Sequence, residues 1–111
     1  MTHSLNKGKC GERSFSRYVE QQLSSHTYKG EPITCRRGQQ HKGGEDSPDC
    51  VSNLPVHFEV KRTERLRLYD AVEQAIRDGG DLVAVAHRAN YKKWVAVVPM
   101  DQFLLLLVDK E

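Results

Sequence analysis

The sequence predicts one α/β domain in which helices flank a mixed five-stranded β-sheet, in the order helix, three strands, helix, two strands, helix. Three observations lead to this fold class. Residues 11–23 and 68–78 carry apolar side chains at helical spacing. In other short segments apolar and polar residues alternate, or nearly all residues are apolar, which are the two patterns of β-strands. The length of 111 residues allows one ordinary core and no second domain.

The first helix is expected from about Gly11 to Leu23. Phe15, Val19 and Leu23 form its apolar stripe, and Glu12 falls on the same stripe, three residues before Phe15. The acid is therefore predicted to project toward the core. The alternative is that an acid in a first helical turn is simply favoured by the backbone dipole.

A polar loop is expected at residues 38–47, which read Gly-Gln-Gln-His-Lys-Gly-Gly-Glu-Asp-Ser. Such a segment buries too little apolar surface to hold one conformation. We expect it to be mobile without a ligand, and residues 1–6 to be flexible.

A β-hairpin is predicted around residues 49–61. From Val56 to Lys61 apolar and polar residues alternate, which is the period of a half-buried strand, so Glu59 and Lys61 project from one face. The turn-like segment 52–55 lets residues 49–51 pair antiparallel with this strand. Asp49 would then lie beside Glu59.

This arrangement predicts a metal site that hydrolyses phosphodiesters. Two neighbouring carboxylates repel each other unless a proton or a cation lies between them. Magnesium prefers oxygen ligands and keeps several waters, so Asp49, Glu59 and the backbone carbonyl of Val60 would suffice. Lys61 would orient or help deprotonate a water and offset charge on the phosphate. A solvated strand face with a cross-strand ion pair is the alternative.

The remaining elements are predicted from spacing and turn residues. The apolar positions of Leu68–Asp78 have helical spacing, and the helix ends at two glycines. Residues 82–87 and 94–98 are predicted strands joined by a polar turn around Asn90. A last helix begins at Pro99.

The last helix contains the run Phe-Leu-Leu-Leu-Leu-Val at residues 103–108. It is apolar around its whole circumference, which is more than one helix can hide against one sheet. A two-fold partner would cover it, so a homodimer through this helix is predicted, with two sites per assembly. Deep burial within one thick core is the alternative.

Charge and cysteine content narrow the function classes. The formal net charge is only +2, so the distribution of positive residues matters more than their sum. They fall in three groups near the proposed site: Lys7, Lys9, Arg13 and Arg17; Lys29, Arg36, Arg37 and Lys42; Arg62, Arg65 and Arg67. Phosphate contacts of this kind position a duplex without reading its sequence. Ordinary surface decoration is the alternative.

Other classes are disfavoured. No apolar run is long enough for a membrane span and no signal peptide is visible, so a soluble cytoplasmic protein is expected. Cys10, Cys35 and Cys50 are odd in number and widely spaced. That spacing argues against a disulfide framework and against a zinc site built on paired cysteines.

Several motifs together resemble a known family. Lys7-Gly8 followed by Glu12-Arg13, then Arg36-Arg37, Ser47-Pro48-Asp49 and Glu59-Val60-Lys61, are similar to the archaeal-type Holliday junction resolvases. These belong to the PD-(D/E)xK nuclease superfamily and also occur in phage genomes. The resemblance spans almost the whole chain. It implies a restriction-endonuclease-like core, Mg²⁺ dependence with Mn²⁺ able to substitute, and a homodimer that resolves four-way DNA junctions by paired symmetric nicks.

The resemblance also implies residue roles. The catalytic residues would be Glu12, Asp49, Glu59 and Lys61, with Glu12 reaching the metal through a water. By the resemblance, Arg13 and one of Arg36 and Arg37 would contact DNA phosphates near the site. The clustering of positive charge extends the expected DNA contacts to the full set of Lys7, Lys9, Arg13, Arg36, Arg37, Lys42 and Arg62. Ser47 and Gln74 would support the site, although a solvent-facing glutamine is the alternative for Gln74.

Two other functions are compatible with the same motifs. One is a nuclease of the same superfamily that cuts flaps, mismatches or plain duplex. The other is a catalytically silent DNA-binding module that keeps the scaffold. Either would act in the cytoplasm of a prokaryotic or phage-infected cell.

Overall fold

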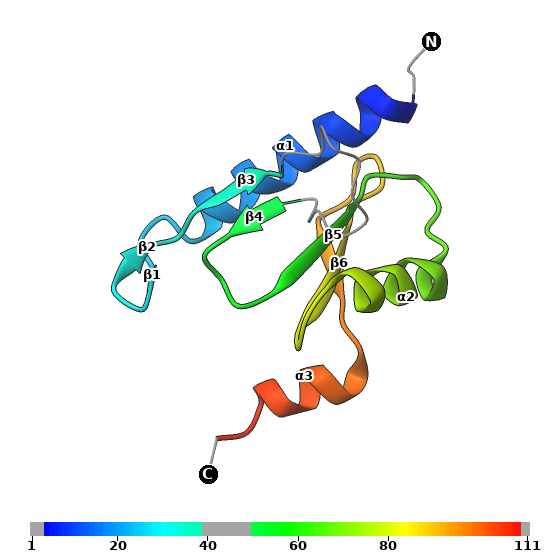
Figure 1. Cartoon of the computed structure of the whole chain (residues 1–111). Coiled ribbons are helices and arrows are strands. Elements are labelled where there is room, and N and C mark those ends of the chain that lie inside the picture. The colour runs from blue at the N-terminus through cyan, green and yellow to red at the C-terminus, as the bar shows by residue number, and fades with distance from the viewer. Residues whose placement is uncertain (1–3, 39–49, 110–111) are drawn as a thin grey trace.

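The computed structural model describes residues 4–38 and 50–109, and of residues 4–9 it describes only the helical backbone. Three helices and small β-sheets make up this part of the chain (Figure 1). In chain order the elements are α1 (Ser4–Gln22), β1 (Thr27–Tyr28), β2 (Glu31–Pro32), β3 (Cys35–Arg37), β4 (Cys50–Ser52), β5 (His57–Lys61), α2 (Leu68–Asp78), β6 (Val83–His87), β7 (Val95–Val97) and α3 (Met100–Leu106).

The predicted α/β class is confirmed, and so are most of the predicted elements. Helix α2 has the predicted bounds, and β6 and β7 lie within the predicted strands 82–87 and 94–98. Helix α1 begins at Ser4 instead of Gly11, because no proline interrupts residues 4–11. Residues 4–6, which were expected to be flexible, are therefore helical. The loop predicted at residues 38–47 falls almost entirely outside the described residues.

The largest sheet has three strands. Strand β5 pairs with β6 in parallel, and β6 pairs with β7 antiparallel. The parallel pair is connected by α2, which covers one face of the sheet, while α1 lies along the other (Figure 1). The buried run Val83–Ala86 suits a central strand that is covered on both faces.

The strand before the candidate site pairs differently from the prediction. Strand β4 pairs antiparallel with β3, with Arg37 opposite Cys50, and not with β5 as the predicted hairpin required. Asn53 explains the difference, because its side chain accepts the Thr34 amide at 3.0 Å and donates to the Pro32 carbonyl at 2.9 Å. These bonds hold the chain after β4 against residues 32–34. Within the described residues the strands form three separate sheets, not one five-stranded sheet.

The core consists of two apolar clusters, one on each face of the β5–β6–β7 sheet. On the α1 side the ring of Phe15 meets Phe58 and Trp94 edge-on, with ring centroids 4.9 and 5.1 Å away. On the α2 side Ala71 and Ala75 pack against the valines of β6. The sheet and two helices thus form a rigid support for side chains at the ends of β5.

Helix α3 covers neither face. Every residue of the apolar run 103–108 is between 43 and 73 % exposed, and Figure 1 shows the helix lying apart from the sheet. One hydrogen bond that links α3 to the sheet runs from the Val83 amide to Oε1 of Gln102, at 2.8 Å. The alternative of deep burial in one thick core is therefore wrong for this helix. In the described ranges, no helix combines the length and apolarity needed to cross a membrane.

Candidate active site

Three polar side chains share one face of β5: His57, Glu59 and Lys61. Phe58 and Val60 project to the opposite face, where they join the cluster around α1. This alternation is the one predicted from sequence. It directs Glu59 and Lys61 toward the α2 side of the sheet.

Glu59 is a buried acid, with only 4 % of the residue exposed. Its Oε2 lies 3.5 Å from Nε2 of His57, which is longer than an ordinary N–H···O hydrogen bond. A buried carboxylate is costly unless donors or a cation face it. The buried position of Glu59 is therefore typical of a carboxylate that takes part in binding or catalysis.

Lys61 is held by α2. Its ammonium Nζ donates to Oε1 of Gln74 at 3.2 Å, and Ala71 and Ala75 fix that helix on the sheet. Gln74 is half-buried, and its side-chain amide contacts Lys61. The hydrogen bond to Gln74 orients the Lys61 ammonium on the same face of β5 that carries Glu59.

Glu12 supplies a second buried acid, 9 % exposed, so its predicted projection toward the core is confirmed. Its Oε1 accepts a hydrogen bond from Nε of Arg37 at 2.9 Å. The neighbouring Arg36 is exposed. Of the two arginines, Arg36 is the one whose charge faces solvent, whereas Arg37 positions Glu12.

Helix α1 meets the end of β5 at Gly11. A Cβ atom at this position would lie only 2.6 Å from Cβ of Arg62, so the close approach requires glycine. Glu12 follows Gly11 and Lys61 precedes Arg62. Glu12 thus lies near this end of β5 on the α1 side of the sheet, whereas Glu59 and Lys61 project toward the α2 side.

Arg62 continues from this contact into the turn between β6 and β7. Its guanidinium donates to the carbonyl of Arg88 at 3.2 Å and to Oδ1 of Asn90 at 2.8 Å. The predicted DNA-binding arginine is thus anchored at a fixed place beside the site.

Ser16, Cys35 and Cys50 form a cluster of side chains that contacts the backbone of Glu12. Ser16 Oγ lies 3.3 Å from Cys50 Sγ and accepts from Cys35 Sγ at 3.7 Å, and Cys50 Sγ donates to the Glu12 carbonyl at 3.8 Å. The hydrogen bond from Cys50 lowers the pKa of the Cys35 thiol, against the opposing effect of burial. All three cysteines are free thiols.

Several predicted residues fall outside the described part. Lys42, Ser47 and Asp49 lie in the range 39–49, and the side chains of Lys7 and Lys9 are likewise not described. Cys50, which follows Asp49, opens β4 opposite Arg37. In the described chain the two buried carboxylates belong to different elements, Glu12 to α1 and Glu59 to β5. Within residues 4–38 and 50–109 no group of three His, Cys, Asp or Glu is placed to hold a metal ion.

Two features of the site were not predicted. His57 lies beside Glu59, and the strand alternation that places both on one face was the available signal. The pairing of Arg37 with Glu12 joins residues 25 apart in sequence, and no local pattern encodes it. Comparison with models of known protein families, with curated proteins and with solved structures found no match.

Proposed function

We propose that this protein is a Mg²⁺-dependent endonuclease that resolves four-way DNA junctions by paired symmetric nicks. One observation carries the proposal: buried Glu59 and helix-held Lys61 share a face of β5, and buried Glu12 adjoins the end of the same strand. This combination of acids and amine is what hydrolysis of a phosphodiester at a metal site needs. The motif resemblance to junction resolvases adds the choice of substrate.

The proposed ligands are Asp49, Glu59 and the carbonyl of Val60, with Glu12 acting through a water. A bound Mg²⁺, or Mn²⁺ in its place, would polarise the phosphate and lower the pKa of an attacking water. Lys61, held by Gln74, would offset the charge that develops on the phosphate oxygens. Arg37 would keep the Glu12 carboxylate in place.

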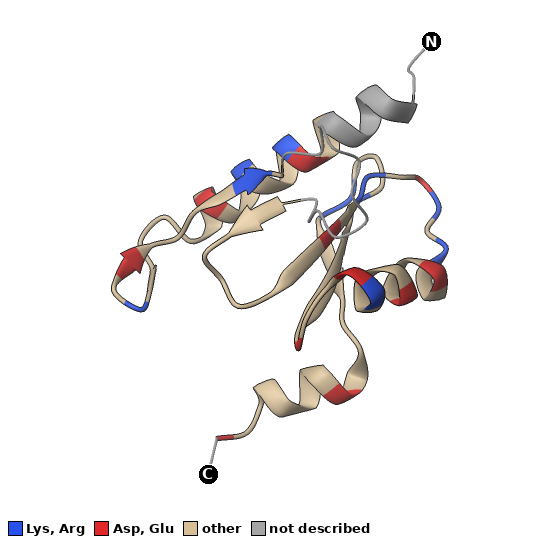
Figure 2. Ribbon diagram, viewed as in Figure 1, with Lys and Arg blue, Asp and Glu red and all other residues tan. Residues whose placement is uncertain are grey.

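Basic residues near the site would grip the DNA backbone. Figure 2 shows Lys and Arg on α1, on β3 and along the segment that follows β5. Arg13 and Arg36 are exposed, and Arg62 is anchored at the end of β5. Lys7, Lys9 and Lys42 would add further phosphate contacts, which fix position without reading sequence.

A second copy of the chain would complete the enzyme. The apolar run of α3 is exposed in one protomer, and an isologous contact would cover it and give two sites for two symmetric cuts. We place this activity in the cytoplasm of a prokaryotic or phage-infected cell.

The test is a cleavage assay on synthetic four-way junction, flap, mismatch and plain duplex, each with Mg²⁺ and with chelator. Paired nicks in the junction, lost with chelator, are expected. Asp49→Asn, Glu59→Gln and Lys61→Ala should each lower the nicking rate by at least about 100-fold while junction binding stays near that of the unaltered protein. Glu73→Gln, which removes an exposed acid of α2, is the control and should cut normally.

Each other outcome has a definite meaning. Faster cleavage of flaps, mismatches or duplex than of junctions would assign a different target within the superfamily. Junction binding with no cleavage by the unaltered protein would identify a silent DNA-binding module. Cleavage that survives Lys61→Ala or the chelator would refute the proposed chemistry.

A further inference from the structure

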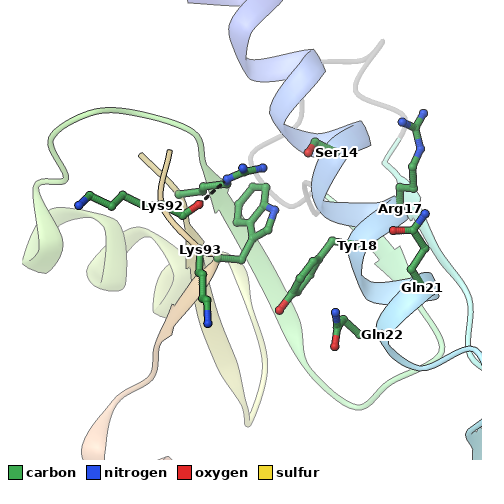
Figure 3. Close-up of a pocket in the computed structure, with 9 residues that line it drawn as sticks. Ser14, Arg17, Tyr18, Gln21, Gln22, Lys92 and Lys93 are labelled. Carbon is green, nitrogen blue, oxygen red and sulfur yellow. Dashed lines mark hydrogen bonds between the residues drawn. The ribbon is translucent and has the colours of Figure 1, made fainter. Parts of the chain in front are cut away.

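A second candidate site lies on the other face of α1. A pocket of about 570 Å³ opens between this helix and residues 88–94, as Figure 3 shows. Its described lining contains four cations, two aromatic rings and three neutral polar groups, and none of these residues is acidic: Ser14, Arg17, Tyr18, Gln21, Gln22, Arg88, Lys92, Lys93 and Trp94.

Helical periodicity builds one wall. The positions 14, 17, 18, 21 and 22 are spaced three and four apart, so they form one stripe of α1. The buried stripe that holds Glu12, Phe15 and Val19 faces the sheet instead. The same helix therefore serves the candidate active site with one face and the pocket with another.

The opposite wall is held in place before any ligand arrives. Trp94 is fixed by its edge contact with Phe15, and its ring centroid lies 6.4 Å from that of Tyr18. Arg88 Nε donates to the Lys92 carbonyl at 2.7 Å, which shapes the turn that carries the lysines. Figure 3 shows Lys92 and Lys93 across the pocket from the α1 side chains, with the Lys92 ammonium pointing away from α1.

This lining matches one ligand chemistry, a phosphate joined to an aromatic base. Cations bind the phosphate, aromatic rings stack on the base, and the amides of the glutamines offer donors and acceptors to its edge. The volume lies within the range of ordinary small-ligand sites. The positive charges of the lining would repel a cationic ligand, and a purely apolar ligand would make no use of them.

We propose that the pocket binds an unpaired nucleotide of a DNA strand, with the base against Tyr18 and Trp94 and a backbone phosphate on Lys93. The inference deepens the proposed function, on which it rests for the identity of the strand, by naming a structural feature of the substrate. Arg62 connects the two sites, because it follows Lys61 and donates to the carbonyl of Arg88. An unpaired nucleotide held here would be fixed relative to the cutting site.

The test uses the single tryptophan of the chain as its reporter. The full-length protein is titrated with a short oligodeoxythymidylate in the presence of chelator, so that binding is measured without cleavage. Quenching of Trp94 fluorescence is expected, because stacking places a base on the ring. An abasic oligonucleotide with the same number of phosphates should bind at least about tenfold more weakly and leave the fluorescence unchanged.

Matched variants separate the pocket from general charge attraction. Lys93→Glu and Tyr18→Ala should each weaken binding of the oligonucleotide by about tenfold or more. Arg77→Glu reverses an exposed charge on α2, outside the pocket, and should weaken it much less. Circular dichroism confirms that each variant is folded, and Trp94→Phe with a labelled oligonucleotide provides a second route to the affinity.

Four results would overturn the inference. They are no quenching of Trp94 by the oligonucleotide, equal binding of the abasic strand, equal losses in Lys93→Glu and Arg77→Glu, and binding of free thymidine monophosphate as tight as that of the oligonucleotide. The last result would assign the pocket to a free nucleotide. If the oligonucleotide quenches Trp94 but the protein does not cut DNA, only the nuclease proposal is refuted. If the protein cuts DNA but Trp94 is not quenched, only the nucleotide-pocket proposal is refuted.

Discussion

Glu12 shows what a sequence can and cannot specify about one residue. Helical periodicity predicts correctly that its side chain projects toward the core, because the direction depends only on neighbours within one turn. Its partner Arg37 lies on another element, and that contact depends on how α1 packs against β3. The same limit applies to Lys61, whose acceptor Gln74 was suggested by resemblance alone.

The Arg37–Glu12 pair should be measurable in stability. Arg37→Met removes a charged hydrogen bond to a carboxylate that is largely buried, so the free energy of unfolding should fall by about 1–3 kcal/mol in urea titrations. Arg36→Met is the matched control one residue away. It is exposed and should change stability by no more than about 0.5 kcal/mol. Equal effects of the two substitutions would mean that the pair does not hold Glu12.

At the scale of elements, prediction succeeded where the signals were local and repeated. Helix α2 has the predicted bounds because its apolar spacing and its two closing glycines agree. The pairing of β4 with β3 was missed, since strands of three residues carry little periodicity and the register depends on the side chain of Asn53. Asp49, which the missed hairpin was to place, lies outside the described residues.

The end of α2 provides a prediction about packing between elements. A Cβ at Gly79 would lie 2.5 Å from Cγ1 of Val83 and 2.9 Å from Cβ of His57, so Gly79→Ala should lower the free energy of unfolding by about 1–3 kcal/mol. At Gly80 a Cβ would meet nothing within 4 Å. Gly80→Ala should therefore cost nothing and could add up to about 1 kcal/mol. Denaturant titration measures the free energy of unfolding of both variants. An unchanged value for Gly79→Ala would contradict the close packing of Gly79 against Val83 and His57.

At the scale of the whole molecule, the sequence predicted the layers but not the continuity of the sheet. The α/β class follows from the order of elements, and the exposed run of α3 was expected to need a partner. Whether short strands join into one sheet depends on contacts between distant segments, which no single pattern records. The described strands form three sheets.

The exposed α3 predicts self-association. Leu105 is 73 % exposed, so Leu105→Glu should leave the stability of the protomer nearly unchanged but abolish a dimer formed through this helix. Sedimentation equilibrium at micromolar concentration measures this. Tyr69→Glu, at a residue of α2 that is 79 % exposed, is the control and should remain dimeric. A monomeric unaltered protein, both free and with junction DNA, would contradict the proposed assembly.

The central claim is that acids from separate parts of the chain meet around one cation beside Lys61. Nuclear magnetic resonance with a trace of paramagnetic Mn²⁺ tests it residue by residue. The amide signals of Glu12, Glu59, Val60 and Lys61 should broaden first, and Asp49→Asn should abolish this selectivity. Broadening centred instead on the exposed acids of α2, with the signals of residues 59–61 unaffected, would contradict the claim.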